Sequence, residues 1–443
     1  MTDARATFAS RFGTILTMIG VAVGLGNVWR FPYLVGKFGG TAFVLFYVAI
    51  AVLVGVPALV AEWSLGRHTR RGTLGAFERA GLPGGKLVGK LLFCVVVAAT
   101  AYYTNVVGWV LYFALAELLS AVGVTIRASA ILPPETGFDG TSFLLQLACT
   151  ITVILTCVAV LERGLRKGIE RASIIIMPLL FLILLVLIVR SVTLPGAGAG
   201  LHWYLGKFAW RDLTPTVMVA AMGQAIFSLS LGGTFMVTYG SYLSEKEPLL
   251  ASAGWTVFGD TAAGLMAGLV IFPAVFAFGL TPGSGPGLLF DTIPRVFAMM
   301  PGGAFFGALF FLGLFGAAYL SDVAAFEVLV AGLVDSTGLT RQRAVRRMAL
   351  IVGAVSVVPM LNLKLFVVWD LTFGSGMQAV GALISVLTAG WFISRAALLE
   401  QVGDQGPVHK TFVFCIRFII PVAILSVALW WLLTDALGIV KTV

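Results

Sequence analysis

The chain has little charge. Only 11% of its 443 residues are Asp, Glu, Lys or Arg, whereas 59% are hydrophobic and the mean hydropathy is +1.01. This composition excludes a soluble globular domain and indicates a protein that crosses a membrane several times. The net charge of +9 comes from basic residues in short loops between apolar stretches, so it does not indicate a nucleic-acid partner.

The chain also has few residues suited to catalysis or to binding a transition metal. Its three histidines lie far apart, and its four cysteines lie in apolar stretches without the spacing of metal ligands. It has no phosphate-binding glycine loop and no nucleophile elbow. The N-terminus runs into the first apolar stretch without a small-residue cleavage site, so we expect no cleavable signal peptide. We predict that the protein is not an enzyme.

Eleven apolar stretches are long enough to be membrane spans. They cover residues 12–36, 41–66, 88–122, 143–162, 168–190, 214–242, 251–280, 303–334, 346–360, 371–394 and 412–437. Lys and Arg gather in the loops that fall on the same side as the N-terminus. Because basic loops stay in the cytoplasm, we predict an inner-membrane protein with its N-terminus inside and its C-terminus outside.

Two of these stretches contain residues that break a helix. In the first, Gly20, Gly24 and Gly26 are followed closely by Asn27 and Arg30; in the sixth, two serines precede adjacent glycines within 222–234. Unwound backbone at membrane depth survives only where it is buried or lines a cavity, and it offers carbonyls to cations and amides to anions. A glycine-rich packing face is the alternative interpretation of the first stretch.

Several further motifs are long and specific. They are Glu62-Trp63-x-x-Gly66-Arg67, Tyr102-Tyr103 six residues before Trp109, Lys167-Gly168-Ile169-Glu170-Arg171, and Gly223-Gln224 before Phe227-Ser228-Leu229-Ser230. With these motifs, the chain resembles the neurotransmitter:sodium symporter family, and is similar to its bacterial, eleven-span members. The resemblance runs from about residue 5 into the eleventh span.

The resemblance implies an all-α polytopic membrane protein with two inverted five-helix repeats and an eleventh helix. It divides the chain into a cytoplasmic segment 1–11, a first repeat 12–190, an extracellular loop 191–213, a second repeat 214–395, and a loop with the eleventh span 396–443. The implied function is sodium-coupled amino acid symport by alternating access. Two alternatives stay open: a symporter with one sodium or partial proton coupling that carries a basic amino acid, and a substrate sensor that has lost transport.

The resemblance also implies the residues around the substrate. They are Ala22, Gly24, Leu25, Gly26, Ala99, Thr100, Tyr103, Val106, Phe227, Ser228, Ser230, Gly233, Ser321, Asp322 and Ala325. Gly24 indicates a substrate that brings its own carboxylate, because monoamine carriers have an Asp there. Gly233 replaces a Phe of the leucine-specific relative, and Ala99 and Ala325 replace β-branched residues. We therefore expect an amino acid with a large, aromatic or donor-bearing side chain.

Two sodium sites follow from the same resemblance. The first is formed by Ala22, Asn27, Ser228 and Asp260, and the fixed charge of Asp260 makes a chloride ion unnecessary. The second is formed by Gly20, Val23, Ala317 and Ser321, but Leu320 stands where the family has an oxygen ligand. One or two sodium ions are thus expected. The helical register points Asp322 into the substrate pocket with Ser321 and Ala325, although a shifted helix would bring it to the second sodium site.

The resemblance implies two gates. Arg30 and Asp370 would close the outer path above Phe227, and Arg5 and Asp335, with Tyr242 nearby, would close the inner path. Phe8 stands where the family has Trp, which predicts a weaker closure of the inner gate.

Overall fold

The computed structural model describes residues 5–206, 208–282, 287–402 and 406–436 and is a bundle of helices. Each of the eleven predicted spans contains at least one helix, and for some spans a second helix lies within the span or directly beside it. In chain order, these helices are α1 (Arg11–Ala22) with α2 (Phe31–Phe38), α3 (Gly40–Ile50) with α4 (Val56–Thr69), α6 (Gly85–Ala121), α7 (Gly140–Glu162), α8 (Arg171–Val192), α10 (Pro215–Ser228) with α11 (Phe235–Gly240), α12 (Leu249–Ala277), α14 (Gly303–Thr337), α15 (Arg341–Met360), α16 (Leu363–Trp369) with α17 (Met377–Leu387), and α19 (Pro407–Phe414) with α20 (Ile420–Trp431).

Short helices lie in the connections. They are α5 (Thr73–Arg79), α9 (Ala197–Leu201), α13 (Ile293–Met299) and α18 (Arg395–Val402). The predicted loop 191–213 contains α9, and the predicted segment 396–443 contains most of α18 together with α19 and α20. Residues 1–4 and 437–443, at the ends of the two predicted terminal segments, lie outside the described residues. The boundaries of the two repeats stay a prediction.

Most of the eleven predicted spans are helical segments long and apolar enough to cross a bilayer. Within the described residues, eight helical segments have this character, and there are nine if Arg11–Ala22 and Gly26–Phe38, bent by 53°, form one span. The sixth span is divided into two short helices, α10 and α11. The ninth, α15, begins with a basic turn that contains Arg341, Arg343, Arg346 and Arg347, which lowers its hydropathy. The two remaining predicted spans are therefore helical but individually short or locally charged.

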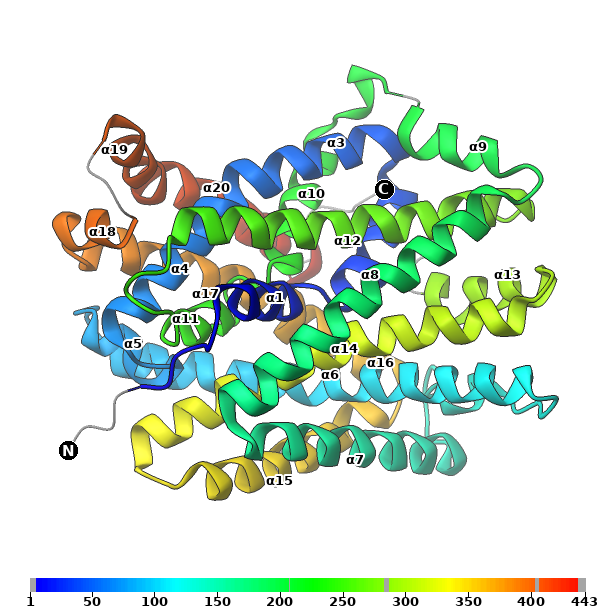
Figure 1. Cartoon of the computed structure of the whole chain (residues 1–443), viewed down its shortest axis with the longest axis horizontal. Helices are drawn as coiled ribbons and strands as arrows, with labels where there is room; N and C mark the ends of the chain where they lie inside the picture. The colour runs from blue at the N-terminus through cyan, green and yellow to red at the C-terminus, as the bar shows by residue number, and fades with distance from the viewer. Residues whose placement is uncertain (1–4, 207, 283–286, 403–405, 437–443) are drawn as a thin grey trace.

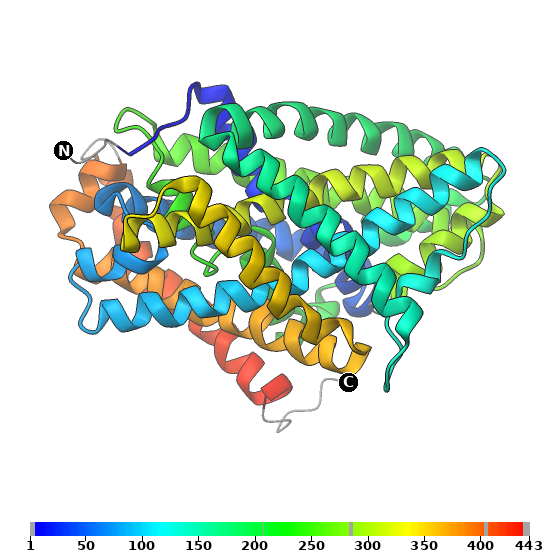
Figure 2. The same ribbon diagram turned by 90° about the horizontal axis from the view of Figure 1, so that it is seen from below.

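The broken helices lie inside the bundle. In Figure 1, α1 lies near the centre, with α12 and α14 close to it, and the long helices run along the longest axis of the molecule. Packing between α1 and each of α8, α12 and α14 confirms this position. Figure 2 shows the last helix, coloured red, at the edge of the bundle, and α20 packs against α10 and α17.

The third and eighth spans resemble each other in length and packing. Helix α6 has 37 residues and α14 has 35, and the two pack along one another. They hold corresponding places in two five-span halves, as do the two broken spans, α1–α2 and α10–α11. This correspondence is the structural counterpart of an internal repeat.

The two helix breaks are joined by side chains. The amide of Gln224 donates to the Gly26 carbonyl at 2.8 Å, and the Ser230 hydroxyl donates to the Val21 carbonyl at 3.0 Å. The fully buried Glu62 accepts a hydrogen bond from the Gly232 N–H at 2.8 Å. The bonds made by Ser230 and Glu62 supply partners for backbone groups that unwinding leaves without helical ones, which allows irregular backbone in an apolar bundle.

Candidate functional site

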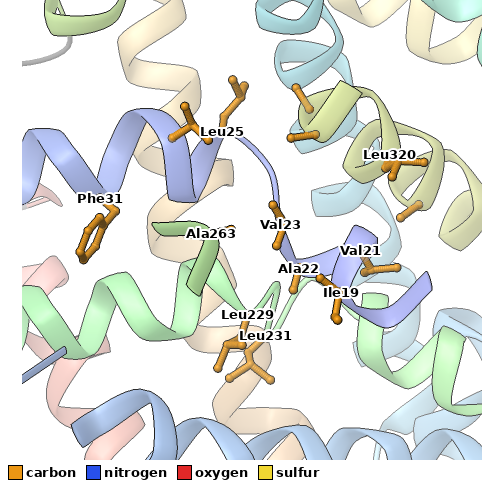
Figure 3. Close-up of a cluster of buried hydrophobic side chains, with 14 of the residues drawn as sticks. Ile19, Val21, Ala22, Val23, Leu25, Phe31, Leu229, Leu231, Ala263 and Leu320 are labelled. Atoms are coloured by element: carbon orange, nitrogen blue, oxygen red, sulfur yellow. The ribbon is translucent and has the colours of Figure 1, made fainter. Parts of the chain in front are cut away.

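The first break is a short non-helical connection between α1 and α2. Figure 3 shows it as a thin trace at Val23, with Leu229 and Leu231 of the second break beside it. The Gly24 N–H donates to the side-chain oxygen of Asn27 at 3.0 Å, so Asn27 holds the turn from within. A side chain at Gly24 would have no room, since its first carbon would lie 2.6 Å from Ser321 Oγ and 2.7 Å from Tyr103 Oη.

Three of the four residues expected at the first sodium site meet directly. The Asn27 amide donates to Ser228 Oγ at 2.9 Å and to Asp260 Oδ1 at 2.7 Å, and the Ser228 hydroxyl donates to Asp260 Oδ2 at 2.8 Å. All three side chains are buried. The fourth residue, Ala22, ends α1 beside them. The carboxylate and the hydroxyl are ligands that fit a hard cation such as Na⁺, while the Asn27 amide turns its N–H groups to them and its oxygen to the Gly24 N–H in this structure.

Tyr47 is a further member of this cluster that the sequence interpretation missed. Its hydroxyl lies 3.4 Å from both Ser228 Oγ and Asp260 Oδ2, and its side chain is fully buried. A polar atom in the middle of the second span was the signal that could have identified it. Asp260 is thus held by neutral donors from three other spans.

The residues expected at the second sodium site also lie together. The Ser321 hydroxyl donates to the Val23 carbonyl at 3.0 Å, and Ala317 is fully buried one turn earlier on α14. Leu320 points towards Gly20 on α1, because its Cδ1 lies 3.1 Å from where a side-chain carbon of Gly20 would be. A methyl group therefore occupies the position beside Gly20.

A cavity of about 60 Å³ lies between the two breaks and α6, α14 and α17. Most of the expected substrate residues line it: Ala22, Gly24, Gly26, Ala99, Thr100, Tyr103, Phe227, Ser230, Gly233, Ser321 and Ala325. Leu25 and Val106 instead line a larger outer cavity of about 660 Å³, and Ser228 faces Asp260. Phe227 and Tyr103 border both cavities.

Asp322 lies elsewhere than the sequence predicted. It does not line the inner cavity; its carboxylate accepts from the Thr104 hydroxyl at 2.9 Å and from the Cys157 thiol at 3.7 Å. Successive helix residues are turned by about 100°, so Ser321 faces α1 while Asp322 is turned towards α6 and α7. The prediction that Asp322 faces the substrate pocket is therefore wrong.

The space beside Gly233 is also different from the expected vacancy. A side-chain carbon at Gly233 would collide with the ring of Phe235, which itself lines the cavity. The volume that a Phe would fill at position 233 is thus partly taken by Phe235. Comparison of position 233 alone with a relative cannot reveal that Phe235 fills this space, because Phe235 lies two positions later in the chain.

Other cavity-lining residues were not predicted. They are Val95, Val96, Tyr102, Gly232, Phe235, Phe373, Gly374 and Gln378. Gln378 is the one with a recognisable signal, because an amide within an apolar span indicates a functional position.

At the predicted outer gate, the Arg30 guanidinium lies over the Phe227 ring, 4.3 Å from its centre. Arg30 and Asp370 line the outer cavity together. Asp370 Oδ1 and the Tyr102 hydroxyl both lie close to Gly374. Phe227 thus separates the two cavities, with a cation stacked on its outer face.

At the predicted inner gate, Arg5 forms an ion pair with Asp335 in which Nη1 donates to both carboxylate oxygens, at 2.6 and 2.7 Å. The Arg5 guanidinium also lies 4.7 Å from the centre of the Tyr242 ring. Burial lowers the pKa of Arg5, but Tyr242 and Asp335 raise it by more, so this pKa lies above its ordinary value and the side chain stays charged.

The inner gate extends further into the bundle. The Tyr242 hydroxyl donates to Glu327 at 2.6 Å, and Arg341 forms an ion pair with the same carboxylate at 2.6 Å. Phe8 stacks on Tyr239 with ring centres 6.5 Å apart and meets Tyr242 edge-on. These contacts tie Arg5 and Phe8 to Asp335, Tyr239 and Tyr242.

Comparison with known proteins agrees with this arrangement. The sequence pattern of the Sodium:neurotransmitter symporter family matches residues 5–124 and 139–434. The chain belongs to this family. It is 33% identical over 449 residues to an uncharacterized sodium-dependent transporter of Bacillus subtilis (strain 168), covering 95% of this chain and 96% of the relative.

Two further similarities extend the comparison. The sodium-dependent serotonin transporter of Drosophila melanogaster is 28% identical over 372 residues, covering 75% of this chain and 60% of that protein. The crystal structure of MhsT in complex with L-phenylalanine superposes with a TM-score of 0.83 and 33% identity, covering 96% of this chain and 99% of the other.

These findings confirm the predicted family and the predicted fold class, an all-α membrane protein with two inverted five-helix repeats and an eleventh helix. The chain is a sodium-dependent transporter, and its family is one of transporters.

Proposed function

We propose that this transporter carries an amino acid with a large side chain into the cell, coupled to sodium. The observation that supports this most directly is the inner cavity between the two helix breaks. Tyr103 borders this cavity beside Gly24 and Gly26, and its hydroxyl accepts from the N–H of Leu25, which lines the outer cavity, at 3.3 Å. Backbone amides at the start of a half-helix and a phenolic hydroxyl are suited to a carboxylate.

The rest of the cavity supports a large side chain. Ala99, Gly233 and Ala325 are small, and Phe227, Phe235 and Phe373 offer apolar ring surfaces. The relative whose structure superposes on this one is described in complex with L-phenylalanine. An aromatic amino acid fits this combination of small and aromatic walls.

The sodium ions are proposed to bind at the two positions described above. Ala22, Asn27, Ser228 and Asp260 would hold one ion, and its charge would be balanced by Asp260 without chloride. Gly20, Val23, Ala317 and Ser321 would hold a second ion weakly, because Leu320 offers no oxygen. The gates are proposed to be Arg30 with Asp370 on the outside, and Arg5 with Asp335 and Tyr242 on the cytoplasmic side of the inner membrane.

Partial proton coupling through Asp322 is a second candidate function. The Thr104 hydroxyl lies 2.7 Å from the Thr100 carbonyl as well as 2.9 Å from Asp322. The Thr104 hydroxyl has one proton and two acceptors within reach, so a protonated Asp322 would donate to Thr104 and leave that proton to the Thr100 carbonyl. The titratable neighbours of Asp322 are Cys157, Tyr319 and Tyr103, none of them a cation. A carboxyl group inside the membrane without a cationic neighbour is a candidate position for carrying a proton.

Uptake measurements in proteoliposomes test these proposals. We expect labelled phenylalanine or tryptophan to accumulate with an inward sodium gradient and not with potassium on both sides. A sensor would bind the amino acid without accumulating it, and a transporter for basic amino acids would accumulate lysine or arginine instead. Either result would overturn the proposed substrate class.

A further inference from the structure

The inner cavity has one feature that the proposed function does not use. Gln378, on α17, lines both the inner and the outer cavity. Its side-chain oxygen is buried and has no hydrogen-bond partner among the described residues. A buried acceptor without a partner is unfavourable, and such groups in a cavity wall commonly pair with a ligand.

The position of Gln378 is fixed by close packing of α17 on the second helix break. A side-chain carbon at Gly232 would collide with the Gln378 carbonyl oxygen, and one at Gly381 would collide with the Gly232 carbonyl oxygen. Gly232 has φ +84°, a conformation that other residues rarely adopt. The backbone that carries the Gln378 amide therefore cannot withdraw from the cavity without moving the break itself.

The serine and threonine hydroxyl groups of the cavity donate their protons to backbone carbonyls. Thr100 donates to the Val96 carbonyl at 2.7 Å, Ser230 to the Val21 carbonyl at 3.0 Å, and Ser321 to the Val23 carbonyl at 3.0 Å. Among the described residues that line the cavity, Gln378 carries the buried side-chain oxygen that has no hydrogen-bond partner. The nitrogen of the same amide marks its place beside Gly233, because Nε2 lies 3.6 Å from where a side-chain carbon of Gly233 would be.

We propose that Gln378 determines substrate specificity by accepting a hydrogen bond from a neutral donor on an aromatic side chain, such as an indole N–H or a phenolic O–H. The inference deepens the proposed function and rests on it. The substrate carboxylate lies at the first break, and the ring extends towards the second break between Phe235 and Phe373. A cationic side chain is not favoured, because Asp322 is turned away and no carboxylate lies in the described lining of the cavity.

The first test uses the wild-type transporter in proteoliposomes and pairs of competitors that differ in one donor. Tryptophan should inhibit uptake of labelled phenylalanine about 5–10-fold better than N1-methyltryptophan, since a site with a buried acceptor rejects an analogue that leaves it unpaired. Equal inhibition by the two would overturn the inference while leaving sodium-driven uptake of aromatic amino acids intact.

The second test removes the acceptor. Gln378→Met should reduce the preference for tryptophan over N1-methyltryptophan to less than about twofold, with phenylalanine uptake retained as proof of folding. Gln342→Met, at an exposed position on α15, is the matched control and should keep the wild-type preference. An unchanged preference in Gln378→Met would also overturn the inference. If neither aromatic amino acid enters, the proposed function fails and this inference with it.

Discussion

The side chain of Leu320 packs against Gly20, at the position where the proposed second sodium site would need an oxygen ligand. Its Cδ1 lies 3.1 Å from where a side-chain carbon of Gly20 would be, and the neighbouring Ser321 hydroxyl reaches the Val23 carbonyl. An apolar group in this position leaves a bound cation with fewer ligands.

We therefore predict that one sodium ion is coupled to each substrate. The sodium dependence of uptake should show a Hill coefficient of about one, because this coefficient is limited by the number of interacting sites. Leu320→Thr should raise the apparent sodium affinity by about 3–10-fold and steepen the curve. Leu320→Met, which adds no oxygen, is the control. A wild-type coefficient near two would show that the second ion binds despite Leu320.

Chloride should not be required for transport. Asp260 supplies a buried negative charge beside the first sodium position, held by Asn27, Ser228 and Tyr47. Uptake should be unchanged when chloride is replaced by gluconate. Asp260→Asn, which keeps the shape but removes the charge, should lose uptake or make it depend on chloride. Loss of wild-type uptake in gluconate would contradict the assignment.

Substitution of Asp322 should change pH dependence more than substrate choice. Its carboxyl group faces Thr104 and Cys157 and does not line the cavity. If the neutral form is needed, wild-type uptake should fall as the pH rises, and Asp322→Asn, a permanent mimic of that form, should keep its activity at high pH. Competition by a panel of amino acids should rank alike in both proteins. Parallel pH profiles would argue against proton coupling.

Substitution of Gly233 should limit substrate size indirectly. A Phe at this position must displace the ring of Phe235, and overpacking of a formed cavity costs roughly 1–3 kcal/mol. Gly233→Phe should exclude tryptophan while small aliphatic amino acids still bind. Phe235→Ala in the same protein should restore part of the tryptophan binding. Tryptophan affinity at the wild-type level in the single variant would remove the role given to this wall.

Disruption of the proposed inner gate should impair transport, because the conformation closed on the inner side would lose a stabilising ion pair. Arg5 and Asp335 form an ion pair that is largely buried, so Arg5→Glu or Asp335→Arg should each reduce uptake by about 10-fold or more. The double charge swap should recover part of the loss. Recovery will be incomplete, because Asp335 also accepts from the Gly72 N–H and Arg5 donates to Ser241. Absence of any recovery would show that the pair does not act as a unit.

The sequence by itself determined the class of membrane protein, the two helix breaks and the set Asn27, Ser228 and Asp260. Hydropathy marks spans whatever their packing, and adjacent glycines weaken a helix whatever surrounds it. The motif resemblance then brought the distant residues of the set together, because family members share one fold.

Only the tertiary structure decided the direction of Asp322, the filling of the space beside Gly233 by Phe235, and the place of Gln378 in the cavity wall. Helical periodicity fixes the angle between two side chains on one helix, but the rotation and tilt of that helix against its neighbours decide what each side chain meets. Asp322 lies one residue beyond Ser321, and this 100° turn, combined with the packing of α14 on α6 and α7, directs it to Thr104 and Cys157.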